Sequence, residues 1–189
     1  YKRHHPGLMT ATSDKGPLSG CKVLELGSTI SGPFCARLLA DFGADVIKIE
    51  PPEGDTLRSL GQRYKGKSLY AATLLRNKSL ASIDLRQEQG RDIVRKLAAK
   101  CDIVVENFKP GTLEKWGLGY DVLAAVNPRL VMTSISNFGQ TGPSRDYKMT
   151  EIVLYAMGGT MQATGTSDRE PVKLAMTAEQ FFCGPGCPP

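Results

Sequence analysis

The sequence predicts an α/β protein with a Rossmann-like, doubly wound and mostly parallel sheet. Short apolar runs of strand length recur along the chain, and amphipathic stretches of helical length stand between them. A strand, a helix and a second strand fit within residues 21–50. Because parallel strands must be joined by a crossover connection, usually a helix, this alternation indicates a parallel sheet.

The first unit of the sheet is clearly marked. The apolar run 21–27 predicts a strand that ends at Gly27. A helix follows, because Pro33 suits a first helical turn and Gly43 ends the apolar periodicity. The second strand, 45–50, is closed by two prolines. The apolar positions at helical spacing are Leu38, Leu39 and Phe42.

The remaining elements continue the alternation. A polar connection over 53–77 contains one short helical stretch, "YAATLLRNK". Strands are predicted over 79–85, 101–108 and 129–139, and helices over 86–100, 120–127 and 149–163, the second ending before Pro128 and the last at its glycines. The apolar face of the helix over 86–100 consists of Ile93, Val94, Leu97 and Ala98.

The composition is that of an ordinary soluble globular protein, with 41% hydrophobic and 23% charged residues. The net charge of +5 comes from Lys and Arg scattered among Asp and Glu, so no nucleic-acid partner is expected. A solvated surface is the plainer interpretation of this excess, and a small polyanionic ligand is the alternative. No apolar run approaches the roughly 20 residues needed to span a bilayer, so no membrane partner is expected.

The cysteines favour a reducing, cytoplasmic compartment. Cys21, Cys35 and Cys101 lie within apolar stretches, where a free cysteine acts as a small core residue. Cys183 and Cys187 fall in a Pro/Gly-rich tail, and both histidines lie near the N-terminus. No zinc or other metal site is expected from this distribution.

Three segments are expected along the chain. Residues 1–16 have no apolar core and are interpreted as a leader. Residues 17–182 form the single α/β domain, and residues 183–189 form an irregular tail that continues neither a helix nor a strand. A chain that ends in this way is expected to be shortened or frame-shifted.

The loop after the first predicted strand, "GSTISGP", is not a dinucleotide fingerprint. Such a motif needs glycines two and five residues after Gly27, where Thr29 and Gly32 stand. No P-loop occurs either. One interpretation is a strand-to-helix turn with Ser31 as the helix N-cap, and the other is a loop that meets a ligand.

The loop after the strand over 101–108 carries more chemistry than a turn requires. Pro110 with Gly111 makes a turn unaided. Before them, Asn107 offers directional hydrogen bonds and Phe108 a stacking face, while Lys109 and the nearby Lys115 offer charge for phosphate. This set suits an adenine nucleotide with additional phosphate, and the alternative is a solvated loop with one buried ring.

Five stretches together strongly resemble class III CoA-transferases, the family of formyl-CoA transferase and the carnitine and bile-acid inducible transferases. They are "LELGSTISGPFCARLLADFGADVIKIEPPEGDTLR", "RNKSLASIDL", "CDIVVENFKPGTLEKWGLGYDVL", "NPRLVMTSISNFGQTGP" and "EIVLYAMGGTMQATG". The resemblance runs from about Pro17 to Phe182 and covers the N-terminal part of the family, whose members are roughly twice as long.

The resemblance implies a large domain that binds coenzyme A or acyl-CoA, with a small carboxylic acid as second substrate and no metal. It implies an interlocked homodimer in the full-length family. It also implies that the acyl group passes through an aspartyl mixed anhydride and thioester. By motif, Asn107, Phe108 and Lys109 look like the family's loop around CoA, and Lys115 and Trp116 occupy the positions of its adenine and phosphate contacts.

Further positions are implied by the same resemblance. Ile83 and Arg86, which follow the "ASIDL" strand, match positions that line CoA. Thr29 and Ile30 lie where the family approaches the reacting acyl group. Lys148 matches another position that lines the ligand.

The nucleophile is ambiguous. The family's Asp should fall after "REPVKLAMT", where counting from Thr177 and Ala178 gives Glu179, and counting back from Gly184 gives Gln180. A glutamate could form the anhydride with one more methylene of reach, whereas a glutamine could not. Two hypotheses therefore stand: a CoA-transferase that uses Glu179, or a CoA-binding fragment or family member without the nucleophile.

Two other possibilities are disfavoured. A racemase of this family would be expected to have a His-Asp pair where Thr150 and Glu151 stand. Glu151 is another acidic candidate, but a charge at a helix N-terminus explains it more simply. A plain NAD(P)-binding domain is disfavoured by the missing glycine fingerprint.

Overall fold

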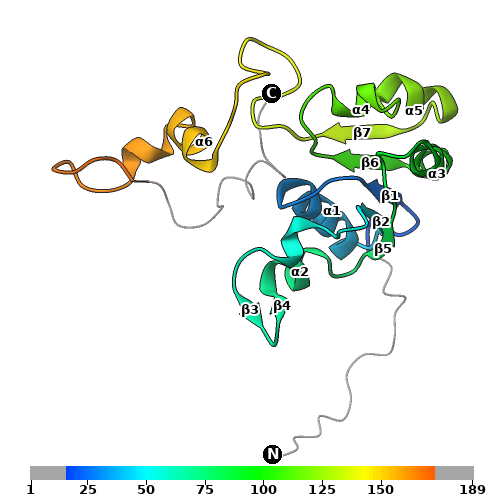
Figure 1. Ribbon diagram of the computed structural model, residues 1–189, viewed down its shortest axis with the longest axis horizontal. Helices are drawn as coiled ribbons and strands as arrows, with labels where there is room; N and C mark the ends of the chain where they lie inside the picture. Colours follow the sequence, from blue (N-terminus) through cyan, green and yellow to red (C-terminus); the bar gives the residue numbers. More distant parts are fainter. Residues whose placement is uncertain (1–15, 173–189) are drawn as a thin grey trace, which may run out of the picture.

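A five-stranded parallel sheet forms the centre of the protein, in the strand order β5-β2-β1-β6-β7 (Figure 1). The structure is a computed structural model and describes residues 16–172. From β1 the sheet grows first through β2 to β5 and then on the other side through β6 to β7, which is the predicted doubly wound pattern. The strands are β1 (Lys22–Glu25), β2 (Asp45–Glu50), β5 (Ser79–Ser82), β6 (Ile103–Glu106) and β7 (Val131–Ser134).

Helices cover both faces of the sheet, and alternating strand residues point to each layer. Leu24 packs in one cluster with Val94 and Ala98 of α3 (Glu88–Ala98), on the face that also holds α4 and α5. Val23 packs on the other face, against α1. The predicted layers are thus confirmed. Their helices are α1 (Ser31–Asp41) and, contacting it, α2 (Leu69–Leu74) on one side, with α3, α4 (Thr112–Lys115) and α5 (Tyr120–Val126) on the other.

Helix α1 approaches the sheet through small side chains rather than through the large ones that its periodicity suggested. Phe42, at its C-terminal end, is 55% exposed, and the expected apolar face is wrong in that respect. Small side chains let the helix backbone lie close to the strands beneath it, which larger ones would prevent. Helix α3 shows a similar shift, because Ile93 is 45% exposed. The buried positions of α1 are Gly32, Pro33, Ala36 and Ala40.

The connection after β2 holds more structure than the single helix predicted there. A 3-10 turn, η1 (Thr56–Arg58), is followed by a two-stranded antiparallel hairpin of β3 (Arg63–Tyr64) and β4 (Lys67–Ser68). The predicted helix is α2, which Ser68 caps by accepting a hydrogen bond from Ala71 N. Strands of two residues have too little apolar pattern to be recognised in a sequence.

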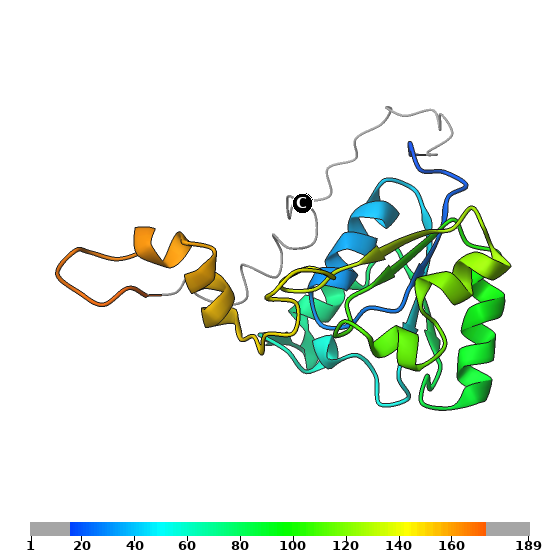
Figure 2. The ribbon, with the colours of Figure 1, turned by 90° about the horizontal axis from the view of Figure 1, so that it is seen from above.

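Helix α6 (Glu151–Met157) and the following turn η2 (Thr160–Ala163) extend away from the sheet in both views (Figures 1 and 2). The helix ends at Gly158, as predicted from the glycines. Within residues 16–172, no helix is long and apolar enough to cross a membrane. No group of three or more potential metal ligands occurs in that same range.

Cys101 is buried, and Cys21 and Cys35 are half-buried, which agrees with their predicted role as small core residues. Burial raises the pKa of all three thiols. Residues 1–15 of the predicted leader and the predicted tail over 183–189 lie outside the described residues.

Candidate functional site

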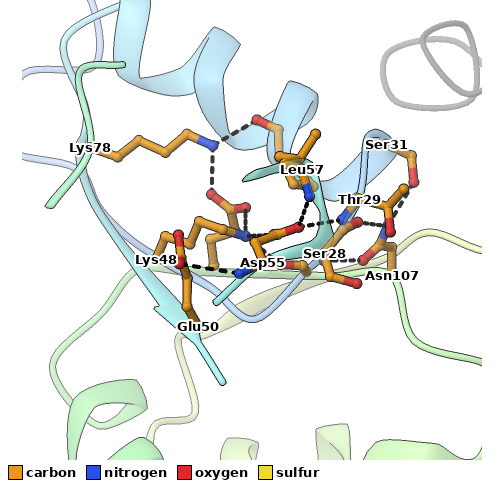
Figure 3. A network of polar contacts seen from close by, with 12 residues as sticks. Ser28, Thr29, Ser31, Lys48, Glu50, Asp55, Leu57, Lys78 and Asn107 are labelled. Carbon is orange, nitrogen blue, oxygen red and sulfur yellow. Dashed lines mark hydrogen bonds and ion pairs between the residues drawn. The ribbon is translucent and has the colours of Figure 1, made fainter. Parts of the chain in front are cut away.

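The loops that follow β1 and β6 are joined by the side chain of Asn107 (Figure 3). Its Nδ2 donates to the carbonyl oxygen of Ser28 at 2.8 Å and to Ser31 Oγ at 2.9 Å. Its Oδ1 accepts from Ser28 N at 2.8 Å. The amide is thus engaged by the protein itself. Asn107 fixes the two loops against each other at the point where the direction of strand order reverses, which is where open α/β sheets bind ligands.

The loop after β1 is the predicted strand-to-helix turn, but the prediction that Ser31 is its N-cap is wrong. The residue before the helix is Ile30, and no side chain caps the helix. Ser31 instead begins the helix, and its hydroxyl accepts the hydrogen bond from Asn107. The amide of Asn107, which the sequence brings from a distant loop, has taken the hydroxyl that would otherwise serve the helix end.

Gly27 and Gly32 leave the space that Asn107 fills. A Cβ atom at Gly32 would lie 3.1 Å from Asn107 Cγ and 3.1 Å from Gly27 Cα. A Cβ atom at Gly27 would lie 2.9 Å from Asn107 Oδ1. The two glycines are therefore required for close approach of the loops, and not for a phosphate motif.

We expect Gly32→Ala to destabilise the protein. Alanine is favoured in a helix by roughly 0.5–1 kcal/mol over glycine, but crowding of a packed site costs about 1–3 kcal/mol, so crowding should win. Urea unfolding measures the difference. In an Asn107→Ala background the added methyl group no longer meets the Asn107 amide and only its contact with Gly27 Cα remains, so the loss should shrink. An equal loss in both backgrounds would contradict this account.

Thr29 adopts a left-handed backbone with φ of 65°. For a β-branched residue this conformation costs about 1–3 kcal/mol and requires support from its surroundings. Thr29 N donates to Asp55 Oδ1 at 3.2 Å, and Thr29 Oγ1 lies 3.2 Å from Thr56 Oγ1. Both supports come from the segment that follows β2.

A buried ionic network lies beneath this loop, on the face of the sheet that α1 covers. The parallel register places Glu25 beside Lys48, and both side chains are 0% exposed. Lys48 Nζ lies 2.8 Å from Glu25 Oε1, 2.6 Å from the carbonyl oxygen of Gly27 and 2.8 Å from Asp55 Oδ2. The first two contacts are hydrogen bonds, whereas the third is an ion pair, because Asp55 Oδ2 accepts no hydrogen bond among the described residues.

A second lysine completes the network. Lys78 Nζ donates to Glu25 Oε2 at 2.6 Å and to the carbonyl oxygen of Pro33 at 2.7 Å. Burial lowers the pKa of Lys78, and the attraction of Glu25 opposes that shift. Two buried cations, Lys48 and Lys78, therefore face two buried anions, Glu25 and Asp55. This network was not predicted from the sequence, although a charged residue at an inward position of each of the first two strands was a visible signal.

Two cavities adjoin these loops. The larger has a volume of about 530 Å³ and lies among the loops after β1, β6 and β7 and the start of α6. Its wall carries three cations, Lys109, Arg145 and Lys148, together with the carboxylate of Glu151. The sequence analysis did not single out Arg145. The smaller cavity, of about 290 Å³, is more apolar and lies between the loops after β2 and β5.

Phe108 belongs to the walls of both cavities. Its ring meets that of Trp116 edge-on, with 5.4 Å between the ring centroids and an interplanar angle of 73°. Ile83 and Arg86 line the same smaller cavity. Arg86 is engaged by Asp84 and Glu53, each at 2.7 Å. An aromatic pair with an aliphatic neighbour forms a slot suited to a flat heterocycle.

The structure brings most of the predicted residues together, but not all. Ile30 is fully buried with Leu57 and Leu74 and lines neither cavity. Lys115 is exposed and lines neither cavity as well. The predicted nucleophile positions, Glu179 and Gln180, lie outside the described residues. The larger cavity receives Thr29, Asn107, Phe108, Lys109 and Lys148, and the smaller one receives Ile83, Arg86, Phe108 and Trp116.

Glu106, the last residue of β6, stabilises the loop that follows this strand. It is 5% exposed, and its Oε2 accepts from Phe108 N at 2.7 Å. Burial raises the pKa of this carboxyl, against the opposing effect of hydrogen bonds from Ser134 and Phe108 N. The folded state therefore favours the protonated carboxyl more than the unfolded state does.

We expect Glu106→Gln to remove a pH-dependent loss of stability. Because the pKa is raised on folding, the native state loses stability relative to the unfolded state as pH rises from the ordinary carboxyl range through the raised value. The free energy of unfolding of Glu106→Gln minus that of the parent should therefore rise with pH across this window and then level off. Urea midpoints from about pH 4 to about pH 8 measure it. A difference in free energy of unfolding that falls as pH rises would contradict this prediction.

Comparison with known proteins decides the family. The model of CoA-transferase family III matches residues 18–184. The chain belongs to this family. It is 48% identical over 171 residues to succinyl-CoA–D-citramalate CoA-transferase of Chloroflexus aurantiacus, covering 89% of the chain and 42% of that relative. It is 39% identical over 176 residues to acetyl-CoA:oxalate CoA-transferase of Acetobacter aceti, covering 93% of the chain and 45% of that relative.

Solved structures of the family share the fold. A CAIB/BAIF family protein from Brucella suis superposes with a TM-score of 0.84 at 42% identity, over 90% of this chain and 46% of that one. The chain thus spans less than half the length of these relatives. In this family member, the two cavities lie at the carboxyl ends of the parallel strands, as expected for a ligand site in a doubly wound sheet.

Proposed function

We propose that this chain binds coenzyme A across the two cavities and that the whole protein moves CoA between carboxylic acids. The observation that carries the proposal is the position of Phe108, which contributes to both walls. CoA has a flat adenine at one end, and its ribose carries a phosphate and a diphosphate close to that base. One cavity offers aromatic and aliphatic walls, and the other offers three cations.

The proposed orientation follows from these walls. Adenine lies against Phe108 and Trp116 in the smaller cavity, where a base gains about 1–3 kcal/mol from an aromatic face. Phosphate groups lie near Lys109, Arg145 and Lys148 in the larger cavity, where Arg can bind phosphate through two parallel hydrogen bonds. In this arrangement, neither Lys115 nor Ile30 contacts CoA.

The substrates are proposed to be an acyl-CoA and a small carboxylic acid. The relatives named for citramalate and oxalate act on dicarboxylic acids by their names, which supports a short diacid as the acid partner.

The reaction is proposed to pass through a carboxylate of the enzyme, with Glu179 as that group. A carboxylate oxygen attacks the thioester carbonyl, the C–S bond breaks and CoA leaves as the thiolate, so that a mixed anhydride forms. The thiolate then attacks the glutamyl carbonyl and the first acid leaves as a carboxylate. The incoming acid reverses these steps. Gln180 cannot form the anhydride, so a chain that used that position would bind CoA without turnover.

Calorimetric titration of the chain with CoA, with NADH as the control ligand, tests the binding. Saturable binding of CoA alone supports the proposal, and binding of NADH with equal affinity would favour a general nucleotide domain. Hydroxylamine trapping after incubation with acyl-CoA tests the nucleophile. A label on Glu179 supports transfer, while CoA binding without any label supports the binding module.

A homodimer in the cytoplasm is part of the proposal for the whole protein. Helix α6 exposes Ile152 and Met157, each more than half exposed, which is apolar surface suited to a partner. Light scattering on the full-length protein measures the oligomeric state. A monomer at all concentrations would contradict this part of the proposal.

A further inference from the structure

The carboxylate of Asp55 stabilises the conformation of the loop after β1, although Asp55 lies outside that loop. Asp55 follows β2 and is 4% exposed. Its Oδ1 accepts from Thr29 N at 3.2 Å and from Leu57 N at 2.9 Å, and its Oδ2 lies 2.8 Å from Lys48 Nζ (Figure 3). Asp55 therefore connects the loop after β1, the turn η1 and strand β2.

Thr29 needs this support because its own preference opposes the conformation it adopts. A β-branched residue is a genuine outlier at φ of 65°, and it returns to an extended or helical backbone when nothing holds it. Its two hydrogen-bonding partners among the described residues are Asp55 and the Thr56 hydroxyl, which are neighbours in sequence. A change at Thr29 would move the wall of the larger cavity, because Thr29 and Ser28 both line it.

Lys48 fixes Asp55 in turn. The ammonium group is held by the carbonyl oxygen of Gly27 and by Glu25, both at the end of β1. The carboxylate of Asp55 is therefore placed by the sheet itself rather than by a flexible surface segment. The loop after β1 is therefore attached, through Asp55 and Lys48, to the carboxyl ends of the central strands.

We propose that Asp55 is a positioning residue for the CoA site: anchored by Lys48, it keeps Thr29 in the left-handed conformation that shapes the larger cavity. The identification of CoA as the ligand rests on the proposed function, whereas the effect of Asp55 on the loop after β1 does not. Asp55 is not expected to touch the reacting atoms.

Three variants of the chain test the inference by CoA titration: Asp55→Ala, Thr29→Gly and the double variant. If the freed loop is competent about a tenth of the time, Asp55→Ala raises the apparent Kd about 10-fold. Glycine adopts a positive φ without a side-chain penalty, so Asp55→Ala should raise the Kd clearly less in the Thr29→Gly background than in the parent background. Any effect of Thr29→Gly itself on binding is common to both members of the second comparison. An equal loss would overturn the inference.

Amide hydrogen exchange gives a readout that does not depend on CoA. In Asp55→Ala the Thr29 and Leu57 amides have lost the carboxylate oxygen that accepted their hydrogen bonds, so both amides should lose protection. Core amides such as Val104 should stay protected. Asp121→Ala removes an exposed carboxylate of α5 and serves as the matched control. Unchanged protection of Thr29 in folded Asp55→Ala would overturn the inference. If the parent chain binds no CoA, the proposed function fails, and hydrogen exchange still decides the positioning role.

Asp55→Asn keeps the test decisive if Asp55→Ala does not fold. The amide oxygen still accepts from Thr29 N and Leu57 N, whereas the charge that faces Lys48 is lost. Without the ion pair that anchors it, this side chain should hold Thr29 less firmly, so the variant should have a lower melting temperature and its Thr29 amide should exchange faster than in the parent. Parent-like protection of the Thr29 amide in folded Asp55→Asn would show that anchoring by Lys48 is not needed, and it would overturn the inference.

Discussion

Lys48→Met is expected to lower the free energy of unfolding by about 3–5 kcal/mol, because removing one partner of a buried ion pair leaves uncompensated charge. The ammonium group faces Glu25, Asp55 and the carbonyl oxygen of Gly27 at full burial. Methionine fills a similar volume but satisfies none of these acceptors. Two carboxylates would then share Lys78 as the one remaining buried cation of the described network.

Urea unfolding of the variant and the parent measures this loss. Lys100→Met, at an exposed position after α3, is the matched control and should stay within about 0.5 kcal/mol of the parent. Lys48→Met combined with Asp55→Asn removes one buried charge of each sign, so it should be more stable than Lys48→Met alone. A loss below about 1 kcal/mol for Lys48→Met would mean that the buried acceptors find other partners.

Phe108→Ala should weaken CoA binding by roughly 5- to 150-fold, since a base on an aromatic side chain is worth about 1–3 kcal/mol. The substitution removes one face of the smaller cavity, opens the wall shared with the larger one and leaves Trp116 without its edge contact. Calorimetric titration with CoA measures the change.

Phe42→Ala is the control for this experiment. Phe42 is 55% exposed at the end of α1 and lines neither cavity. Its replacement should leave the CoA Kd unchanged. An unchanged Kd for folded Phe108→Ala would contradict the placement of adenine at this ring and would require another site for the ligand.

The alternation of strand and helix could be predicted from the sequence because it depends on local patterns. The strand 45–50 was predicted with the bounds that β2 shows. The strands predicted over 101–108 and 129–139 were too long, because β6 ends at Glu106 and β7 at Ser134, and after β6 the Asn107 side chain bonds the loop after β1. Apolar periodicity continues past the last ladder residue and does not mark that point.

Contacts between distant segments could not be predicted from local patterns. Ser31 is a good N-cap residue by type, but Asn107, 76 positions away in sequence, takes its hydroxyl. Ile30 stands in a loop that meets the larger cavity, yet its side chain turns into the cluster with Leu57 and Leu74. The first outcome depends on the pairing of β1 with β6, and the second on how η1 and α2 pack beside the loop after β1. Neither can be recognised from the local pattern of one segment.

Trp116 gives the chain a built-in optical reporter. It is the single tryptophan in the sequence, and it lies on the wall of the smaller cavity against Phe108. All indole emission from the chain therefore comes from one ring within the candidate site. A ligand that enters this cavity should change the colour or intensity of that emission without any label. Ligands that differ only at the adenine end can thus be ranked in a cuvette, each by the signal of one side chain.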